Sequence, residues 1–193
     1  TRSVELAMKN NLILQVLSSL SKNKGTLIVD EKNLIEKEMV SGVSYSKNES
    51  MITISGIPDT PGISARIFGL LADKNINVDM IVQNISQDGK SANITFTVPN
   101  TDVKLACLVL KSDLNKINFN SLNTDKKVSK ISVVGMGMMS QSGVAQKMFK
   151  TLANNSINIL AISTSEIKIS VLIDEKFTNI AVKSLHEAYN LDQ

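Results

Sequence analysis

The sequence predicts an α+β protein with two ferredoxin-like βαββαβ units, the first of which is inserted within the second. Three observations lead to this prediction. Residues from about 51 to 98 recur from about 131 to 173, in constant register from Gly62 and Gly143 onward. Each copy has the apolar patterning of a strand, a helix and two further strands. A strand-like segment, EMVSGVSYS, precedes the first copy without an assigned partner there.

The first copy supplies a complete set of elements. Its opening strand is followed by a glycine-containing loop and by a helix with apolar residues at i, i+3, i+4 and i+7. The polar turn QDGKS joins the next two strands, and a second helix follows the capping residue Thr101. The four strands are predicted at 52–55, 78–85, 93–98 and 118–122, and the second helix at 102–114.

The second copy lacks a fourth strand after its last helix, because the sequence stops soon afterwards. Its strands are predicted at 131–134, 159–164 and 167–173, with the last helix at 178–189. We expect the upstream segment 38–46 to supply the missing strand, although it could also be a plain linker strand. The predicted domains are therefore 1–35, 51–124, and 36–50 plus 125–193.

Residues 1–30 have a different pattern, with a helical segment, a strand, the turn SKNKG and a short strand TLIV. Thirty residues cannot bury a core alone, so this part resembles the tail of an α/β domain whose body is absent. The chain opens at Thr1 directly in a helical pattern, and we expect it to be a fragment or a processed piece.

Composition argues against several classes of function. The net charge of +3 is spread along the chain, so no anionic partner is expected, and aromatic residues make up only 4%, which disfavours base stacking on RNA. One cysteine, Cys107, and one histidine, His186, leave little for a metal site or a nucleophile–base pair. No apolar run approaches about 18 residues, and no signal pattern is visible, so we expect a cytoplasmic protein. The glycine-rich loop 135–140 has no βαβ unit after it, which disfavours a dinucleotide site.

The loop GIPDTPGIS between the first strand and helix has two interpretations. In the structural one, Pro58 and Pro61 stiffen the connection and Gly62 allows a tight entry into the helix. In the functional one, the unpaired N–H groups at the helix start bind a carboxylate while Asp59 binds an ammonium group. These are the two charges of an amino acid.

The two repeats, with DTPGISARIFGLLADKNINVDMIVQNIS, STSEIKISVLI and SLHEAYNL, resemble the tandem ACT domains of aspartokinases. TRSVELA and GTLIV resemble the end of the kinase domain of that family, so practically the whole chain is covered. The resemblance implies a homodimer that binds threonine, lysine or both between ACT domains of two chains and thereby inhibits phosphorylation of aspartate. It also implies a kinase-containing chain as partner.

The resemblance further implies an effector site with residues from both repeats. In the first repeat these are Asp59, Gly62, Ile63, Ser64, Asp79, Val82, Gln83, Asn84 and Ser86. In the second repeat they are Gln141, Val144, Ala145, Thr164, Ser165 and Glu166. Because MGMMSQSG has no acidic residue in the place of Asp59, we expect the second repeat mainly to form the facing wall.

The family's lysine-containing and glycine-rich phosphate segments are absent from this sequence. We therefore expect no catalytic residue, metal or cofactor here, since ATP and magnesium would belong to the parent kinase domain. The alternative function is a dimerisation module that binds no effector. No nucleic-acid or membrane partner is expected.

Overall fold

The computed structural model describes residues 2–28, 40–86, 89–114, 119–135 and 143–191. The chain divides into two compact units, Thr1–Lys37 and Glu38–Gln193. Both repeats lie in the second unit. In the described residues, no helix is long and apolar enough to cross a membrane, and no cluster of metal-binding side chains is found.

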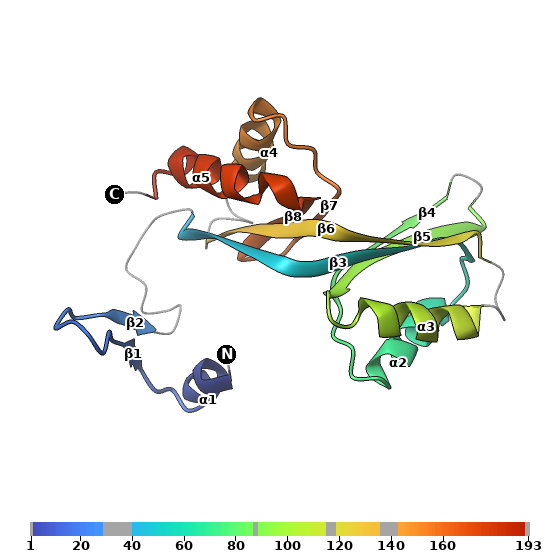
Figure 1. Ribbon diagram of the computed structural model, residues 1–193, viewed down its shortest axis with the longest axis horizontal. Helices are drawn as coiled ribbons and strands as arrows, with labels where there is room; N and C mark the ends of the chain where they lie inside the picture. The colour runs from blue at the N-terminus through green and yellow to red at the C-terminus, as the bar shows by residue number, and fades with distance from the viewer. Residues whose placement is uncertain (1, 29–39, 87–88, 115–118, 136–142, 192–193) are drawn as a thin grey trace. The chain divides into compact units, whose positions relative to one another are not determined.

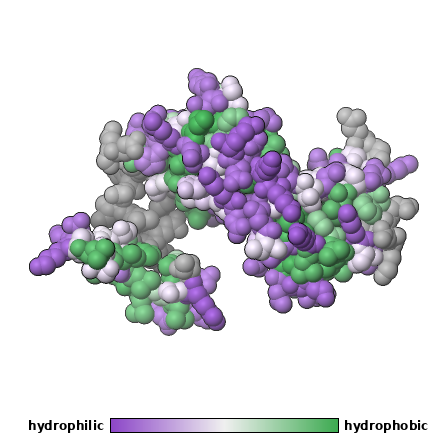
Figure 2. Space-filling view, viewed as in Figure 1, coloured by the Kyte–Doolittle hydropathy of each residue, from purple (hydrophilic) through white to green (hydrophobic). Residues whose placement is uncertain are grey.

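In its described residues, 2–28, the first unit contains one helix and one strand pair, as predicted. Helix α1 (Arg2–Lys9) leads into β1 (Leu14–Val16), which pairs antiparallel with β2 (Thr26–Ile28). Apolar side chains such as Leu12 and Leu27 remain exposed, because so few residues cannot enclose a core. Figure 2 shows the apolar surface of this unit in green. Its assignment as the tail of a kinase domain stays a prediction.

The second unit is built on one six-stranded antiparallel sheet of order β4-β5-β3-β6-β8-β7. Two long central strands, β3 (Gly42–Pro58) and β6 (Ser121–Val134), run through both repeats. The first half of β3 pairs with the second half of β6, from Gly42 opposite Val134 to Ser46 opposite Lys130. The upstream segment thus completes the second repeat, and the predicted insertion is confirmed.

The remaining elements follow the predicted order with small shifts at their ends. The predicted boundaries at 50/51 and 124/125 fall inside β3 and β6, so the two repeats share these continuous strands. The other elements are α2 (Ile63–Ala72), β4 (Asp79–Ile85), β5 (Ser91–Pro99), α3 (Val103–Leu114), α4 (Val144–Asn154), β7 (Ala161–Thr164), β8 (Lys168–Asp174), the 3-10 helix η2 (Glu175–Phe177) and α5 (Thr178–Ala188).

Each repeat has its own core between two helices and the sheet. In Figure 1, α2 and α3 lie on one side of the two long strands, and α4 and α5 lie on the other. In the first core, Phe96 is fully buried and the ring of Phe68 meets it edge-on, with centroids 5.3 Å apart. In the second, Met148 and Leu152 of α4 are equally buried. Each such side chain contributes roughly 1.5–3 kcal/mol through burial.

Candidate functional site

The loop between β3 and α2 is held in place by backbone hydrogen bonds. The N–H of Asp59 donates to the carbonyl of Lys90 at 3.0 Å, and the N–H of Ile63 donates to the carbonyl of Thr60 at 3.2 Å. Gly62, immediately before α2, has φ = 93°, a conformation that residues with a Cβ rarely adopt. The glycine therefore lets the chain enter the helix at this point.

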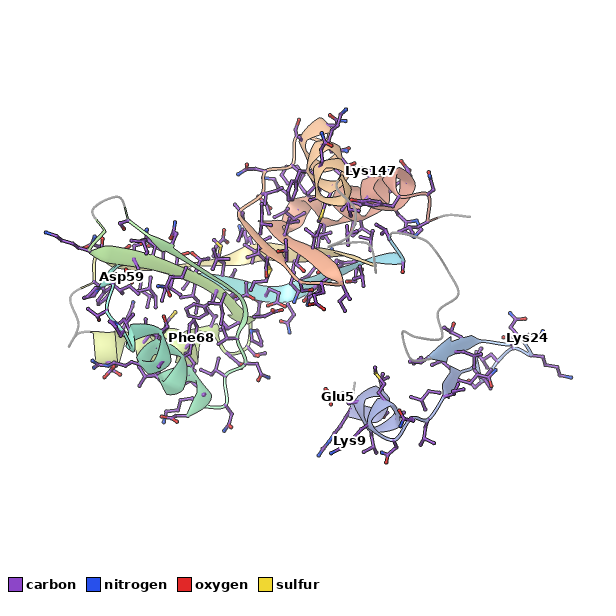
Figure 3. The ribbon with its side chains drawn as sticks, turned by 180° about the vertical axis from the view of Figure 1, so that it is seen from behind. Glu5, Lys9, Lys24, Asp59, Phe68 and Lys147 are labelled. Atoms are coloured by element: carbon purple, nitrogen blue, oxygen red, sulfur yellow. The ribbon has the colours of Figure 1, made fainter. Side chains whose placement is uncertain are left out.

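A shallow hollow of about 400 Å³ opens at this loop. It is lined by the loop and first helical turn, and by one residue of β4: Asp59, Thr60, Pro61, Gly62, Ile63, Ser64 and Gln83. The Ser64 hydroxyl donates to Oε1 of Gln83 at 2.9 Å and so ties the helix start to β4. In Figure 3, Asp59 lies at the end of this repeat's sheet, next to α2. The structure thus gathers five of the predicted residues around one space.

The hollow offers both a negatively charged group and N–H donors that attract negative charge. Asp59 is exposed and carries a carboxylate. Within the described residues, no side chain caps α2, and no backbone acceptor is found for the N–H groups of Gly62 and Ser64. Unpaired N–H groups at a helix start, together with the helix dipole, attract anions. Because the Ile63 N–H is bonded to Thr60, two of the three predicted backbone donors are left for a ligand.

Side chains along β4 alternate between the two faces of the sheet, so the candidates on this strand do not all face the hollow. Gln83 stands opposite Ile94, a residue of the helix-covered core, so its side chain lies on the face that borders the hollow. Val82 and Asn84 stand opposite Thr95 and Asn93 and therefore point to the other face of the sheet.

Two further candidates on this part of the chain already have partners. The Ser86 N–H closes the β4–β5 turn by donating to the carbonyl of Ser91 at 2.8 Å. Asp79 accepts hydrogen bonds from the backbone N–H of Met80 and from Nζ of Lys130. Sequence reasoning missed Lys130, because nothing in the local pattern indicates a partner 51 residues away.

The described second-repeat candidates belong to the start of α4, the end of β7 and the turn from β7 to β8. Gln141 is outside the described residues. Val144 is buried in the second core, and Ala145 packs against that core from the first turn of α4. Thr164 ends β7, and Ser165 and Glu166 belong to the exposed turn to β8, where the Ser165 N–H donates to the carbonyl of Lys168 at 2.8 Å. This turn lies at the same end of the sheet as the segment that leaves β6 towards α4, because the Gly135 N–H donates to the carbonyl of Ile167 at 2.9 Å.

Comparison with known proteins establishes the family. The profile described as ACT domain matches residues 52–114 and 131–189. A chain in the crystal structure of aspartokinase alpha and beta subunits is 46% identical, with a TM-score of 0.73 over 78% of this chain and 99% of that one. The chain belongs to the aspartokinase family. It carries the family's regulatory ACT region, as its resemblance to the tandem ACT domains predicted.

Other aspartokinases agree with this assignment. The ligand-free regulatory subunit of aspartate kinase from Thermus thermophilus is 35% identical, with a TM-score of 0.73 over 78% of this chain and 98% of that chain. The aspartate kinase of Pseudomonas fluorescens is 45% identical over 192 residues, which make up 99% of this chain and 46% of the relative. The chain thus spans about half the length of the curated relatives that it matches.

Proposed function

We propose that this chain is the feedback-sensing part of an aspartate kinase. In this proposal, threonine, lysine or both bind at the hollow beside Asp59 and inhibit the ATP-dependent phosphorylation of L-aspartate by the kinase portion. ATP and magnesium would be bound by that portion. The observation that carries the proposal is the pairing of a free carboxylate with two unpaired helix N–H groups, which matches the two charges of an amino acid.

The shape of the hollow supports a dimeric site. It is shallow and its lining comes from one repeat, so a bound amino acid would remain largely exposed unless a second surface covered it. The exposed apolar side chains Ile81 and Ile85 on the edge strand β4 suit contact with another chain. We therefore propose a homodimer in which ACT domains of two chains enclose the effector, with the second repeat forming the facing wall.

Calorimetric titration with threonine and lysine, separately and together, tests the proposal while light scattering follows the oligomeric state. We expect saturable binding of at least one amino acid to a dimer. Asp59→Asn should weaken it about 10- to 100-fold, because hydrogen bonds to charged groups contribute about 1.5–3 kcal/mol. Asp73→Asn is the matched control, since this exposed acid lies at the other end of α2.

The results separate the two candidate functions. Unchanged affinity in Asp59→Asn would refute the assignment of that carboxylate. A stable dimer that releases no heat with either amino acid would favour the alternative, a dimerisation module without an effector.

A further inference from the structure

A third buried region lies where the two repeats meet. The sheet bends so that its two edge strands, β4 and β7, contact each other. Met80 on β4 and Leu172 on β8 are 4% and 0% exposed, yet among the described residues both lie outside the two helix-covered cores. We infer that these side chains are buried between the repeats. The first repeat is therefore in a position to transmit a change to the second through β4.

An ion-pair cluster sits at this junction. Lys130, on the part of β6 that belongs to the second repeat, donates to Oδ2 of Asp79 on β4 and lies 3.4 Å from Oε1 of Glu49 on β3. The side chains of Lys130 and Glu49 are only 18% and 13% exposed. Removing one member would leave a partly buried charge without its partner, which is costly.

The electrostatics of the cluster favour the charged forms. Burial alone would lower the pKa of Lys130, but the hydrogen bond to Asp79 and the charges of Glu49 and Asp79 outweigh it, so its pKa is raised. Burial would likewise raise the pKa of Asp79, but hydrogen bonds from Lys130 and the Met80 N–H, with the charges of Lys130 and Lys168, lower it.

Asp79 also holds an unusual stretch of backbone. Met80 has φ = 48°, although it is not a glycine, and the register of β4 against β5 shifts between Asp79 and Val82. Such conformations persist only when the surroundings enforce them. Here the Met80 N–H donates to Oδ1 of Asp79 at 2.8 Å, and the Thr97 hydroxyl donates to the Asp79 carbonyl at 3.1 Å. With Lys130 on Oδ2, Asp79 is fixed from three sides.

We propose that Lys130 is a positioning residue that clamps β4, through Asp79, to the second repeat. Gln83, which lines the hollow, lies on the same strand only four positions after Asp79. The clamp therefore ties one wall of the hollow to the second repeat, so that a ligand that shifts β4 also shifts β7 and β8. This regulatory role rests on the proposed function, whereas the clamp itself does not.

Amide hydrogen exchange on the chain without ligand tests the clamp. Lys130→Met removes the charge and keeps an apolar stem, and Lys126→Met is the control, since Lys126 is exposed on the same strand. We expect the Met80 N–H to exchange about tenfold faster in Lys130→Met, with faster exchange also at Leu160, whose N–H donates to the carbonyl of Leu172. Lys126→Met should match the parent chain. Unchanged exchange at Met80 in Lys130→Met would overturn the clamp.

A double-mutant cycle guards against general destabilisation. Asp79→Asn removes the same ion pair from the other side. In the double variant, which carries both Asp79→Asn and Lys130→Met, the Met80 N–H should therefore exchange no more than about twice as fast as in the faster single variant. Fully multiplicative effects would mean that the two residues act independently and would contradict the proposal.

Titration with threonine and lysine then tests the regulatory role. In the parent chain, a bound amino acid should slow exchange both at Ser64 and at Leu160 of the second repeat. Lys130→Met should bind the amino acid with an affinity within about threefold of the parent chain's. In this variant the ligand should still slow amide exchange at Ser64 but no longer at Leu160. Equal slowing at Leu160 in both proteins would overturn the inference. If the parent chain binds neither amino acid, the proposed function fails, and the exchange rates without ligand still decide the clamp.

Discussion

Replacing Gly62 and Gly69 by alanine, one at a time, separates backbone conformation from packing at the candidate site. Both glycines belong to the same short segment, one immediately before α2 and one inside it. No described atom outside the immediate chain neighbourhood lies within 4 Å of a Cβ built at either position. Steric clashes with other parts of the protein therefore do not contribute, and the two substitutions differ only in the backbone conformation that they require.

The expected effects have opposite signs. At Gly62, φ = 93° forces alanine into a left-handed conformation that costs about 1–2 kcal/mol, partly offset by the lower entropy of the unfolded chain. We expect Gly62→Ala to lower the free energy of unfolding by about 1 kcal/mol. At Gly69, inside a regular helix, alanine should raise it by about 0.5–1 kcal/mol.

Urea denaturation followed by circular dichroism measures both changes, because α2 is part of the first core. The two variants should differ by about 1.5–2 kcal/mol at the same m-value. If Gly62→Ala were as stable as Gly69→Ala, the left-handed entry into α2 would not constrain this position, and the argument for a fixed N–H cradle would fail. Calorimetry should also show weaker amino-acid binding for Gly62→Ala alone.

Three further predictions concern the two cores and the junction. Phe96→Ala should lower the free energy of unfolding by about 3–5 kcal/mol in urea, because this ring is fully buried; a loss below about 1 kcal/mol would contradict the core assignment. Tyr189→Phe should cost about 1 kcal/mol, because the hydroxyl donates to the carbonyl of Val144 at 2.7 Å; an unchanged urea midpoint would argue against this bond. Burial raises the pKa of Tyr189 to about 12, so the tyrosine's contribution to the free energy of unfolding is complete below about pH 10 and is lost as the pH rises towards 12. Thermal melts at alkaline pH should show this loss in the parent chain and not in Tyr189→Phe. Because the pKa of Asp79 is lowered, its carboxylate contributes to the free energy of unfolding above about pH 4, and this contribution is lost as the pH falls through the folded-state pKa. Asp79→Asn should therefore make the free energy of unfolding depend less steeply on pH in acid, and an unchanged slope would refute the ion pair.

Much of the fold was predictable because it depends on local periodicity. The constant register between the repeats identified both α2 and α4, and the strand-like pattern of residues 38–46 predicted that an upstream segment would complete the second repeat. The loop of Asp59 and Gly62 was also visible, since a turn followed at once by an apolar helical pattern places free N–H groups at a known point of the chain.

The tertiary structure decided how these parts share one sheet. The sequence predicted short strands separated by a domain boundary, whereas β3 and β6 each continue through both repeats. It also grouped Val82, Gln83 and Asn84 together, although the register of β4 against β5 turns only Gln83 towards the hollow. Register depends on pairing with a strand elsewhere in the chain, and a shift of one residue reverses every side chain.

The partner of Asp79 was equally invisible in the sequence. The sequence shows that an acid begins β4, but the bend that brings β6 of the other repeat against it results from the packing of the whole sheet. Local sequence thus determined the elements and the chemistry of the loop, because helix and strand periodicity act over a few residues. The faces, the shared strands and the Lys130 contact were decided by the fold, because they join residues that are distant along the chain.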